Sequence, residues 1–222
     1  MEKTYSKIMM LSVAFMISMV SFAETKINGV YYNLDGSNNQ AQVTYNESAP
    51  TASYSYSGAV TIPQVVTYDG KEYAVTSIGE EAFLENRGLT SVSIPNSVKS
   101  IGDKAFYGCS ALTSVTIPNS VTTIGEGAFS GCDALTAINI PGSVESIGMG
   151  AFSSCNAIAS IIVDKDNTVY DSRGGCNAIV MIANNMLIAG CKGTIIPNTV
   201  SGIGACAFYG CQSLTISLSL TL

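Results

Sequence analysis

The 222-residue sequence contains no histidine and no tryptophan. Without histidine, the chain cannot form a Ser-His-Asp or Cys-His catalytic group, and it cannot bind zinc through imidazole. Tryptophan is strongly enriched at the centres of protein interfaces, so its absence removes a common anchor for binding partners. The sequence also lacks a glycine-rich phosphate loop followed by Lys and Ser or Thr. We therefore expect no enzymatic activity, no cofactor and no metal site.

Charge is scarce as well. Only 12% of the residues are charged, with 10 Lys or Arg against 16 Asp or Glu and a formal net charge of −6. Because no run of basic residues is present, we expect no nucleic-acid partner. The segment "DKDNTVYD" at 164–171 resembles a calcium loop, but it lacks the glycine and the terminal glutamate of an EF-hand. With 47% hydrophobic residues, the chain has enough apolar material for one sizeable core.

The N-terminus has the pattern of a secretory signal. Lys3 and Lys7 precede an apolar run over 8–20, and Ser21-Phe22-Ala23 places small residues at a cleavage site. The alternative is a membrane anchor, but a run of about 13 residues falls short of the roughly 20 that span a bilayer. We predict a signal peptide over 1–23 and an exported protein, either secreted, periplasmic or on the cell surface, with no membrane span after cleavage.

A 23-residue period runs through the middle of the chain. The dipeptide Ile-Gly recurs with this spacing at Ile78, Ile101, Ile124 and Ile147. Around it the residue types follow the pattern I-G-x-x-A-F-x-x-C-x-x-L-x-x-V-x-I-P-x-x-V-x-x, and a fixed period of this length is typical of solenoids. The Phe position of the pattern is filled by Phe83, Phe106, Phe129, Phe152 and Phe208.

Each repeat predicts one coil of a solenoid. Apolar residues alternate with Ser or Thr in "SVSIP" and "SVTIP", which is the spacing of a strand with one buried face. The proline then removes a backbone donor and ends the strand. The "GxxAF" segment is too short for a full helix and indicates a helical turn or a short 3₁₀ segment. Since one coil cannot bury its apolar residues alone, we predict a strand-rich α/β repeat solenoid with a parallel β-sheet.

This repeat resembles that of the bacterial surface-antigen (BspA-like) leucine-rich repeat family. The long motif is matched in three consecutive full units and in partial units beyond them, from Gly58 to about Leu214. The resemblance implies a leucine-rich repeat fold and a bacterial protein that is secreted or displayed at the cell surface. It also implies adhesion or host interaction rather than catalysis.

Two regions outside the regular repeat carry further expectations. Residues 24–76 lack the period and are rich in tyrosine. We predict that they form an N-terminal cap with irregular strands and a hairpin at Asp69-Gly70, and a tyrosine-rich binding patch is the alternative.

The chain ends in "LTISLSLTL", which alternates like a strand with nothing to cover it. The hypothesis that follows is self-association through this C-terminal edge.

The solenoid itself is assigned to residues 77–222. Within it, the interval between Ile147 and Ile203 measures 56 residues instead of 23. We interpret this interval as two coils, the second enlarged by a hairpin, at about 164–201.

The seven cysteines form two groups. Cys109, Cys132 and Cys155 share one position of the repeat, which Cys211 continues. Thiols in neighbouring coils are parallel, so they suit neither a disulfide nor tetrahedral zinc, and we interpret them as buried packing residues. Cys176, Cys191 and Cys206 lie outside this column, and Cys176 and Cys191 could be opposed near the base of the predicted hairpin. A disulfide between them is compatible with export.

The outward residues of the predicted strands are the candidate partner-binding face. We expect a non-catalytic binding or adhesion module for an extracellular protein or glycan of unknown identity. The alternative is a structural or spacer element without a specific ligand. The candidate contact residues are Ser91, Ser93, Ser114, Thr116, Ala137, Asn139, Ser160 and Ile162.

Overall fold

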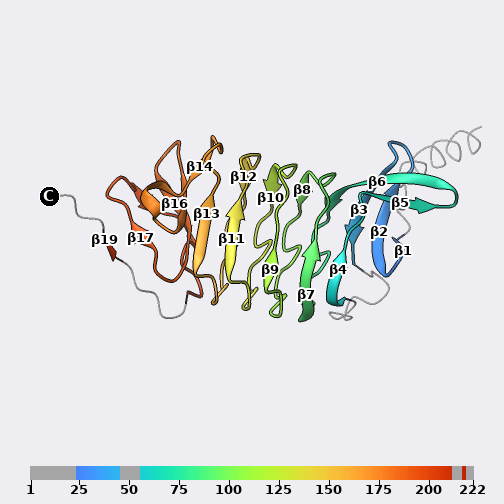
Figure 1. Cartoon of the computed structure of the whole chain (residues 1–222), viewed down its shortest axis with the longest axis horizontal. Coiled ribbons are helices and arrows are strands. Elements are labelled where there is room, and N and C mark those ends of the chain that lie inside the picture. The colour runs from blue at the N-terminus through green and yellow to red at the C-terminus, as the bar shows by residue number, and fades with distance from the viewer. Residues whose placement is uncertain (1–23, 46–55, 212–216, 219–222) are drawn as a thin grey trace, which may run out of the picture.

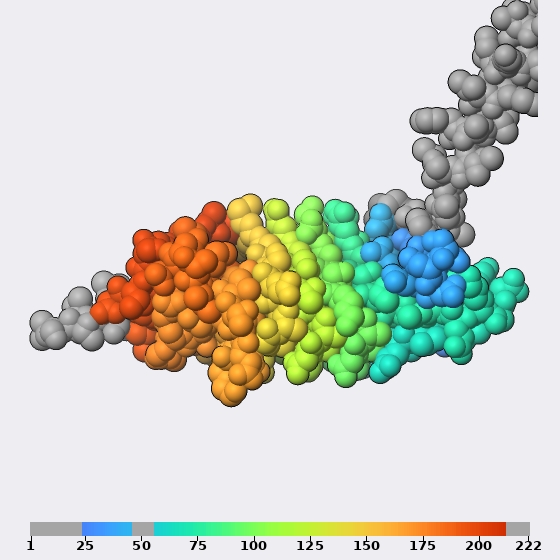
Figure 2. Space-filling view, turned by 90° about the horizontal axis from the view of Figure 1, so that it is seen from above, coloured from blue at the N-terminus to red at the C-terminus, as the bar shows by residue number. Residues whose placement is uncertain are grey.

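The computed structural model describes residues 24–45, 56–211 and 217–218. They form an elongated solenoid whose coils follow one another along the long axis from the N-terminus to the C-terminus (Figures 1 and 2). Regular structure is almost entirely strand. The described elements are β1 (Glu24–Ile27), β2 (Val30–Asp35), β3 (Gln40–Thr44), β4 (Ser57–Thr61), β5 (Val65–Tyr68), β6 (Lys71–Ile78), β7 (Gly88–Ser93), β8 (Ser100–Ile101), β9 (Ser114–Val115), β10 (Thr123–Ile124), β11 (Ala137–Ile140), β12 (Ser146–Ile147), β13 (Ser160–Val163), β14 (Tyr170–Asp171), the 3₁₀ turn η1 (Arg173–Gly175), β15 (Ala178–Met181), β16 (Met186–Gly190), β17 (Ile195–Ile196), β18 (Gly202–Ile203) and β19 (Ser217–Leu218).

Two rows of strands run along the solenoid. One row belongs to an eight-stranded sheet with the order β1-β2-β3-β6-β8-β10-β12 and with β5 added to β6 (Figure 1). The other row is divided into the sheets β4-β7-β9 and β11-β13. The repeat strands are parallel, and Ile101 is paired with Ile124 and Ile124 with Ile147. The register therefore advances by one repeat per strand, which confirms the predicted solenoid with 23-residue coils.

The residues before the first regular coil extend the eight-stranded sheet. Strands β1, β2 and β3 are antiparallel neighbours, and β3 pairs in parallel with β6. Strands β5 and β6 form an antiparallel hairpin at Asp69-Gly70, where both residues have positive φ, as a tight two-residue turn requires. The side chains of Tyr32, Tyr56 and Tyr73 are buried. These tyrosines are therefore core residues and not part of a binding patch.

In the regular coils, the glycine of the Ile-Gly pair lies where the backbones of successive coils meet. A Cβ atom on Gly102 would lie 2.6 Å from the backbone nitrogen of Glu80. A Cβ atom on Gly125 would lie 2.5 Å from the backbone nitrogen of Asp103. Since Cβ contacts below 3.0 Å essentially never occur, only glycine fits between the coils at this position.

The segment after each Ile-Gly pair is a series of hydrogen-bonded turns, which we call the turn side of the coil. In the second regular coil, the amide of Tyr107 donates to the carbonyl of Lys104, and the amide of Cys109 donates to the carbonyl of Phe106. Left-handed backbone at Lys104 (φ +51°) and Gly108 (φ +70°) interrupts the helical path. The predicted helical turn thus takes the form of consecutive i→i+3 turns.

A ladder of phenylalanines forms the centre of the core. The rings of Phe83, Phe106, Phe129 and Phe152 stack at centroid distances of 4.9, 5.1 and 5.6 Å with interplanar angles of 8° or less. Tyr56 covers the N-terminal end of this ladder, since its ring centroid lies 4.7 Å from that of Phe83. Offset stacking and full burial both stabilise such a column, which explains why the repeat carries Phe at one position.

The enlarged coil changes the path of the chain after β13. Strands β14, β15, β16 and β18 form a separate four-stranded sheet, and β15 and β16 pair as an antiparallel hairpin. Leu187 and Ala207 belong to a second, smaller core, against which Phe208 packs. Phe208 therefore occupies the repeat position in sequence but lies in a different cluster from Phe152.

Two expectations concern residues outside the described part of the chain. The predicted signal peptide at 1–23 is one of them. Most of the predicted C-terminal strand is the other, and only Ser217–Leu218 of it is described, as β19, which pairs in parallel with β17.

Candidate binding surfaces

The strand face consists of the outward residues of β7, β9, β11 and β13, with the residues that continue these strands. The alternation is as predicted: Ile138 and Ile140 of β11 are buried, whereas Ala137 and Asn139 are exposed. Of the eight predicted contact residues, Ser91 and Ser160 are half-buried, and the exposed members are Ser93, Ser114, Thr116, Ala137, Asn139 and Ile162.

The register brings these residues together in pairs. Ser91 lies opposite Ser114 in the pairing of β7 with β9, and Asn139 lies opposite Ile162 in the pairing of β11 with β13. None of these eight residues is charged, and they carry hydroxyl and amide groups. Ile162 is its large exposed apolar residue, with 54% of its surface accessible. Such a face can form hydrogen bonds and limited apolar contacts.

The strand face is interrupted between β9 and β11, which belong to different sheets. The coils remain stacked there, because β10 pairs with β12 on the other row. An open cavity of about 390 Å³ lies at the proline ends of the strands around this interruption. Its lining residues are Ile117, Asn119, Asn139, Ile140, Pro141, Ile162 and Asp164. Two predicted contact residues, Asn139 and Ile162, thus line a cavity, and the neighbouring Asn119 and Asp164 were not predicted.

The edge of β13 is closed by side chains of the enlarged coil. The amide of Ile161 donates to Oδ1 of Asn177 at 2.7 Å, and the amide of Val163 donates to Oγ of Ser172 at 3.1 Å. These side chains satisfy donors that the next strand of a regular solenoid would accept. The strand face therefore ends at β13.

The cysteine column links neighbouring coils. The thiols of Cys109, Cys132 and Cys155 are buried, and each donates a hydrogen bond to the carbonyl of a phenylalanine in the preceding coil. Burial raises the pKa of the Cys109 thiol to about 12. Interaction with the Cys155 thiol, followed by burial, raises the pKa of the Cys132 thiol. The burial and the hydrogen bonds of these three side chains agree with the interpretation that they are packing residues.

Cys176 and Cys191 are both buried, and their thiols are free in the structure. The disulfide between them stays a prediction. Burial raises the pKa of both thiols, to about 11 for Cys191.

Within residues 24–45, 56–211 and 217–218, no three Cys, Asp or Glu side chains are grouped in a way that could hold a metal ion. In the same part of the chain, no helix has the length and apolar character needed to cross a membrane.

Comparison with known protein families gives a match over most of the chain. The profile described as "BspA type Leucine rich repeat region" matches six copies over residues 72–174 and 189–222. No curated protein matches the chain.

Solved structures with similar folds are leucine-rich repeat proteins from bacteria. The chain is 34% identical to a protein from Bacteroides capillosus, with a TM-score of 0.53, over 64% of this chain and 99% of that one. It is 26% identical to a protein from Bacteroides ovatus, with a TM-score of 0.55, over 88% of this chain and 53% of that one. A protein from Eubacterium ventriosum has a TM-score of 0.55 at 19% identity over 88% of this chain and 67% of its own, and this likeness concerns the fold alone. The chain therefore spans about half of the Bacteroides ovatus protein.

Proposed function

Because the chain belongs to the BspA-type leucine-rich repeat family, we propose that it is an exported bacterial surface protein that binds an extracellular protein or glycan. In this proposal the protein is a non-catalytic adhesion module. The solenoid supplies a rigid surface, and the exposed residues between its buried positions supply the contacts.

The observation that carries the proposal is the strand face with its cavity. Exposed hydroxyl and amide side chains lie in register on parallel strands, and the cavity of about 390 Å³ adds a concave feature beside Asn139 and Ile162. Interfaces commonly combine an apolar contact with surrounding hydrogen bonds, and Ile162 with its polar neighbours supplies both. Because the eight contact residues are uncharged and the cavity adds one carboxylate, Asp164, association would depend little on long-range electrostatic attraction.

Export is part of the same proposal. Cleavage after Ala23 would retain all described residues of β1, Glu24–Ile27. N-terminal sequencing of the protein recovered from the cell surface or medium tests this, and a sequence that still contains the apolar run would contradict it.

A capture experiment with a matched pair of variants tests the binding role. The purified protein is incubated with host matrix proteins and with mucus glycoproteins, and retention is measured for each. Thr116→Lys/Asn139→Lys places two charges on the strand face. Thr123→Lys/Ser146→Lys places two charges on exposed residues of the other row of strands in neighbouring coils. We expect the first variant alone to lose capture.

Equal capture by both variants would exclude the strand face as the binding site. Retention of no matrix or mucus component, together with ordered oligomers in solution, would instead favour the structural or spacer role.

A further inference from the structure

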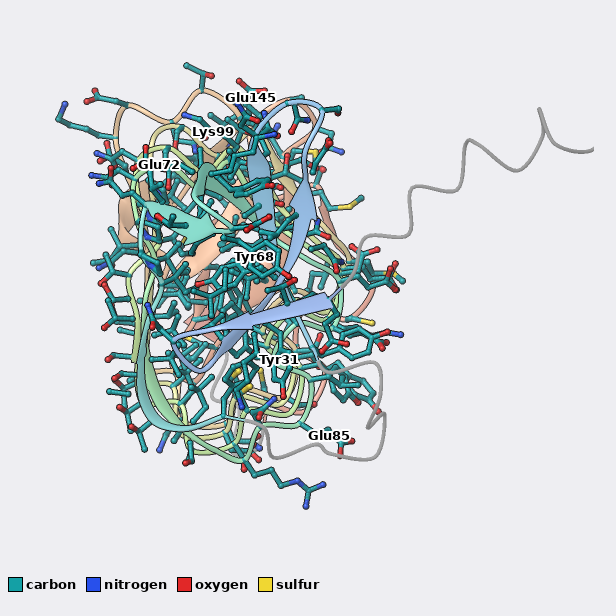
Figure 3. The ribbon with its side chains drawn as sticks, turned by 90° about the vertical axis from the view of Figure 1, so that its right-hand side faces the viewer. Tyr31, Tyr68, Glu72, Glu85, Lys99 and Glu145 are labelled. Carbon is teal, nitrogen blue, oxygen red and sulfur yellow. The ribbon has the colours of Figure 1, made fainter. Side chains whose placement is uncertain are left out.

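A second open cavity, of about 530 Å³, crosses the turn side of the coils. It extends from the coil that contains Glu85 to the coil that contains Tyr209. In the view along the solenoid, Glu85 lies at the edge opposite to Lys99 and Glu145 (Figure 3). Lys99 and Glu145 directly precede β8 and β12, which belong to the other row of strands. We call this cavity the turn-side groove. It shares no lining residue with the cavity at the strand face.

Two exposed tyrosines line the turn-side groove. Tyr107 and Tyr209 are 40% and 68% exposed, and both occur in the same pentapeptide, Ala-Phe-Tyr-Gly-Cys. The pentapeptide has the same backbone in both coils, because the glycines Gly108 and Gly210 have φ of +70° and +76° and the tyrosine amides donate to the residue three positions earlier. The groove is therefore lined by two aromatic side chains that are held by the same local structure.

Between the tyrosines the lining residues are small. Backbone hydrogen bonds tie the intervening coils in sequence: Gly108 to Ser130, Gly131 to Ser153, and Ser154 to Tyr209. Three coil spacings of about 4.8 Å separate the two tyrosines, which amounts to roughly 15 Å along the groove. The last of these bonds shows that the coil of Tyr209 stacks directly on the coil of Ser154, although 55 residues of chain separate them. The enlarged coil therefore does not interrupt the groove.

The groove contains positively and negatively charged side chains, and it contains both hydrogen-bond donors and acceptors. The guanidinium of Arg87 lies 3.6 Å from a carboxylate oxygen of Glu85. The carboxylate of Asp133 accepts a hydrogen bond of 2.7 Å from Asn156, and its remaining lone pairs can accept from a ligand. Ser110 and Ser130 add hydroxyls. With one basic and two acidic side chains, the groove is close to neutral and favours no strongly charged ligand.

From this combination we infer that the turn-side groove binds a neutral oligosaccharide. Sugar rings present apolar C–H faces that stack on tyrosine. Sugar hydroxyls can donate hydrogen bonds to the carboxylates of the groove, accept them from the guanidinium, and do either with the serine hydroxyls. The small residues between Tyr107 and Tyr209 leave room for a linear chain of sugar rings. This inference concerns a different surface from the strand face, so either can be correct without the other.

The test uses the full-length purified protein and defined probes. Maltohexaose, cellohexaose, xylohexaose, mannohexaose and chitohexaose are immobilised beside heparin oligosaccharides, and binding to each is measured, followed by calorimetry on the hits. We expect retention of at least one neutral hexasaccharide. Tyr107→Ala/Tyr209→Ala should weaken that binding by about tenfold or more, because exposed aromatic residues often dominate the affinity of a site.

Matched variants separate a binding role from a structural one. Tyr107→Phe/Tyr209→Phe keeps both rings and should retain most of the affinity. Tyr68→Ala removes a tyrosine of similar exposure, 48%, from the β5–β6 hairpin and should leave binding unchanged. Thermal unfolding of each variant confirms that the fold is intact. Failure to retain any neutral hexasaccharide, retention of heparin oligosaccharides alone, or equal binding by the double alanine variant would overturn the inference.

Discussion

The thiol of Cys132 donates a hydrogen bond to the carbonyl oxygen of Phe106, 3.2 Å away in the preceding coil. The same carbonyl accepts the amide of Cys109, the cysteine of its own coil. One oxygen therefore joins the backbone turn of one coil to the side chain of the next. This arrangement explains why a small, weakly donating side chain is repeated at this position.

Replacing this thiol should destabilise the solenoid moderately. We expect Cys132→Ala to lower the free energy of unfolding by about 1–2 kcal/mol, since it removes one buried hydrogen bond and leaves a small void. Urea unfolding under reducing conditions measures the change. Cys206→Ala is the control, because Cys206 is exposed, and it should change stability by less than about 0.5 kcal/mol. An equal loss in both variants would contradict a specific role for the bond.

The close approach of successive coils at the Ile-Gly pairs predicts a larger loss of stability than that of Cys132→Ala. Gly125→Ala should lower the free energy of unfolding by about 3 kcal/mol, because the new Cβ would collide with the backbone of Asp103 and neither coil can move without its neighbours. Gly204→Ala is the matched control. Its Cβ would lie 3.3 Å from the carbonyl oxygen of Leu187, so it should cost much less. Similar melting temperatures for the two variants would show that the coils yield more easily than their packing implies.

Stability should fall at alkaline pH. Burial raises the pKa of Cys109 to about 12 and that of Cys191 to about 11, whereas the thiols of the unfolded chain ionise near pH 9. Their contribution is therefore fully present below pH 9. Above it the unfolded state binds fewer protons than the folded state, and stability falls as pH rises toward 11 to 12, by up to about 1.4 kcal/mol per pH unit for each thiol.

Urea unfolding at pH 7, 9, 10 and 11 under reducing conditions measures this dependence. Cys109→Ala should be less stable at neutral pH but should show a shallower decline above pH 9, since one titrating group is gone. A free energy of unfolding that stays constant from pH 7 to 11 would rule out the effect.

The end of the phenylalanine ladder gives a fourth prediction. The hydroxyl of Tyr56 donates to the carbonyl of Thr44 and accepts from the amide of Tyr31, both at 3.0 Å. Tyr56→Phe keeps the ring against Phe83 but removes both bonds, so it should cost about 1–3 kcal/mol. Tyr56→Ala should cost more, because the ring itself is lost. Hydrogen exchange of β2 and β3 amides checks the location, and unaltered protection there would argue against a link through Tyr56.

Much of the fold could be predicted because each repeat encodes its own coil. The 23-residue spacing of Ile78, Ile101 and Ile124 is sufficient to predict the parallel register, and alternation in the strand segments predicts which residues face outward. Local pattern could not predict the interruption between β9 and β11, because the two segments have the same alternation. The hydrogen bonds from the β13 amides to the side chains of Asn177 and Ser172 could not be predicted either, because they depend on how the enlarged coil folds back against β13.

The candidate sites follow the same division. The outward residues of the strand face were predictable from period-two alternation, but the cavity beside Asn139 depends on how neighbouring coils are spaced. The repeated Ala-Phe-Tyr-Gly-Cys was a usable signal for Tyr107 and Tyr209. The two tyrosines are 102 residues apart in the sequence, so their proximity could not be predicted from the repeated pentapeptide. Only the structure shows that the coil of Tyr209 stacks directly on the coil of Ser154 on the turn side.

Because the coil of Tyr209 stacks directly on the coil of Ser154, the coils between Tyr107 and Tyr209 set the distance between the two tyrosines. The separation between Tyr107 and Tyr209 equals a whole number of coils, so it can change only in steps of about 4.8 Å. Gain or loss of one complete repeat between them would lengthen or shorten the turn-side groove by one step while every coil keeps its own neighbours. Loss of a single residue would break the register between Ile101 and Ile124 instead. The unit in which this surface can vary is thus the repeat, not the residue.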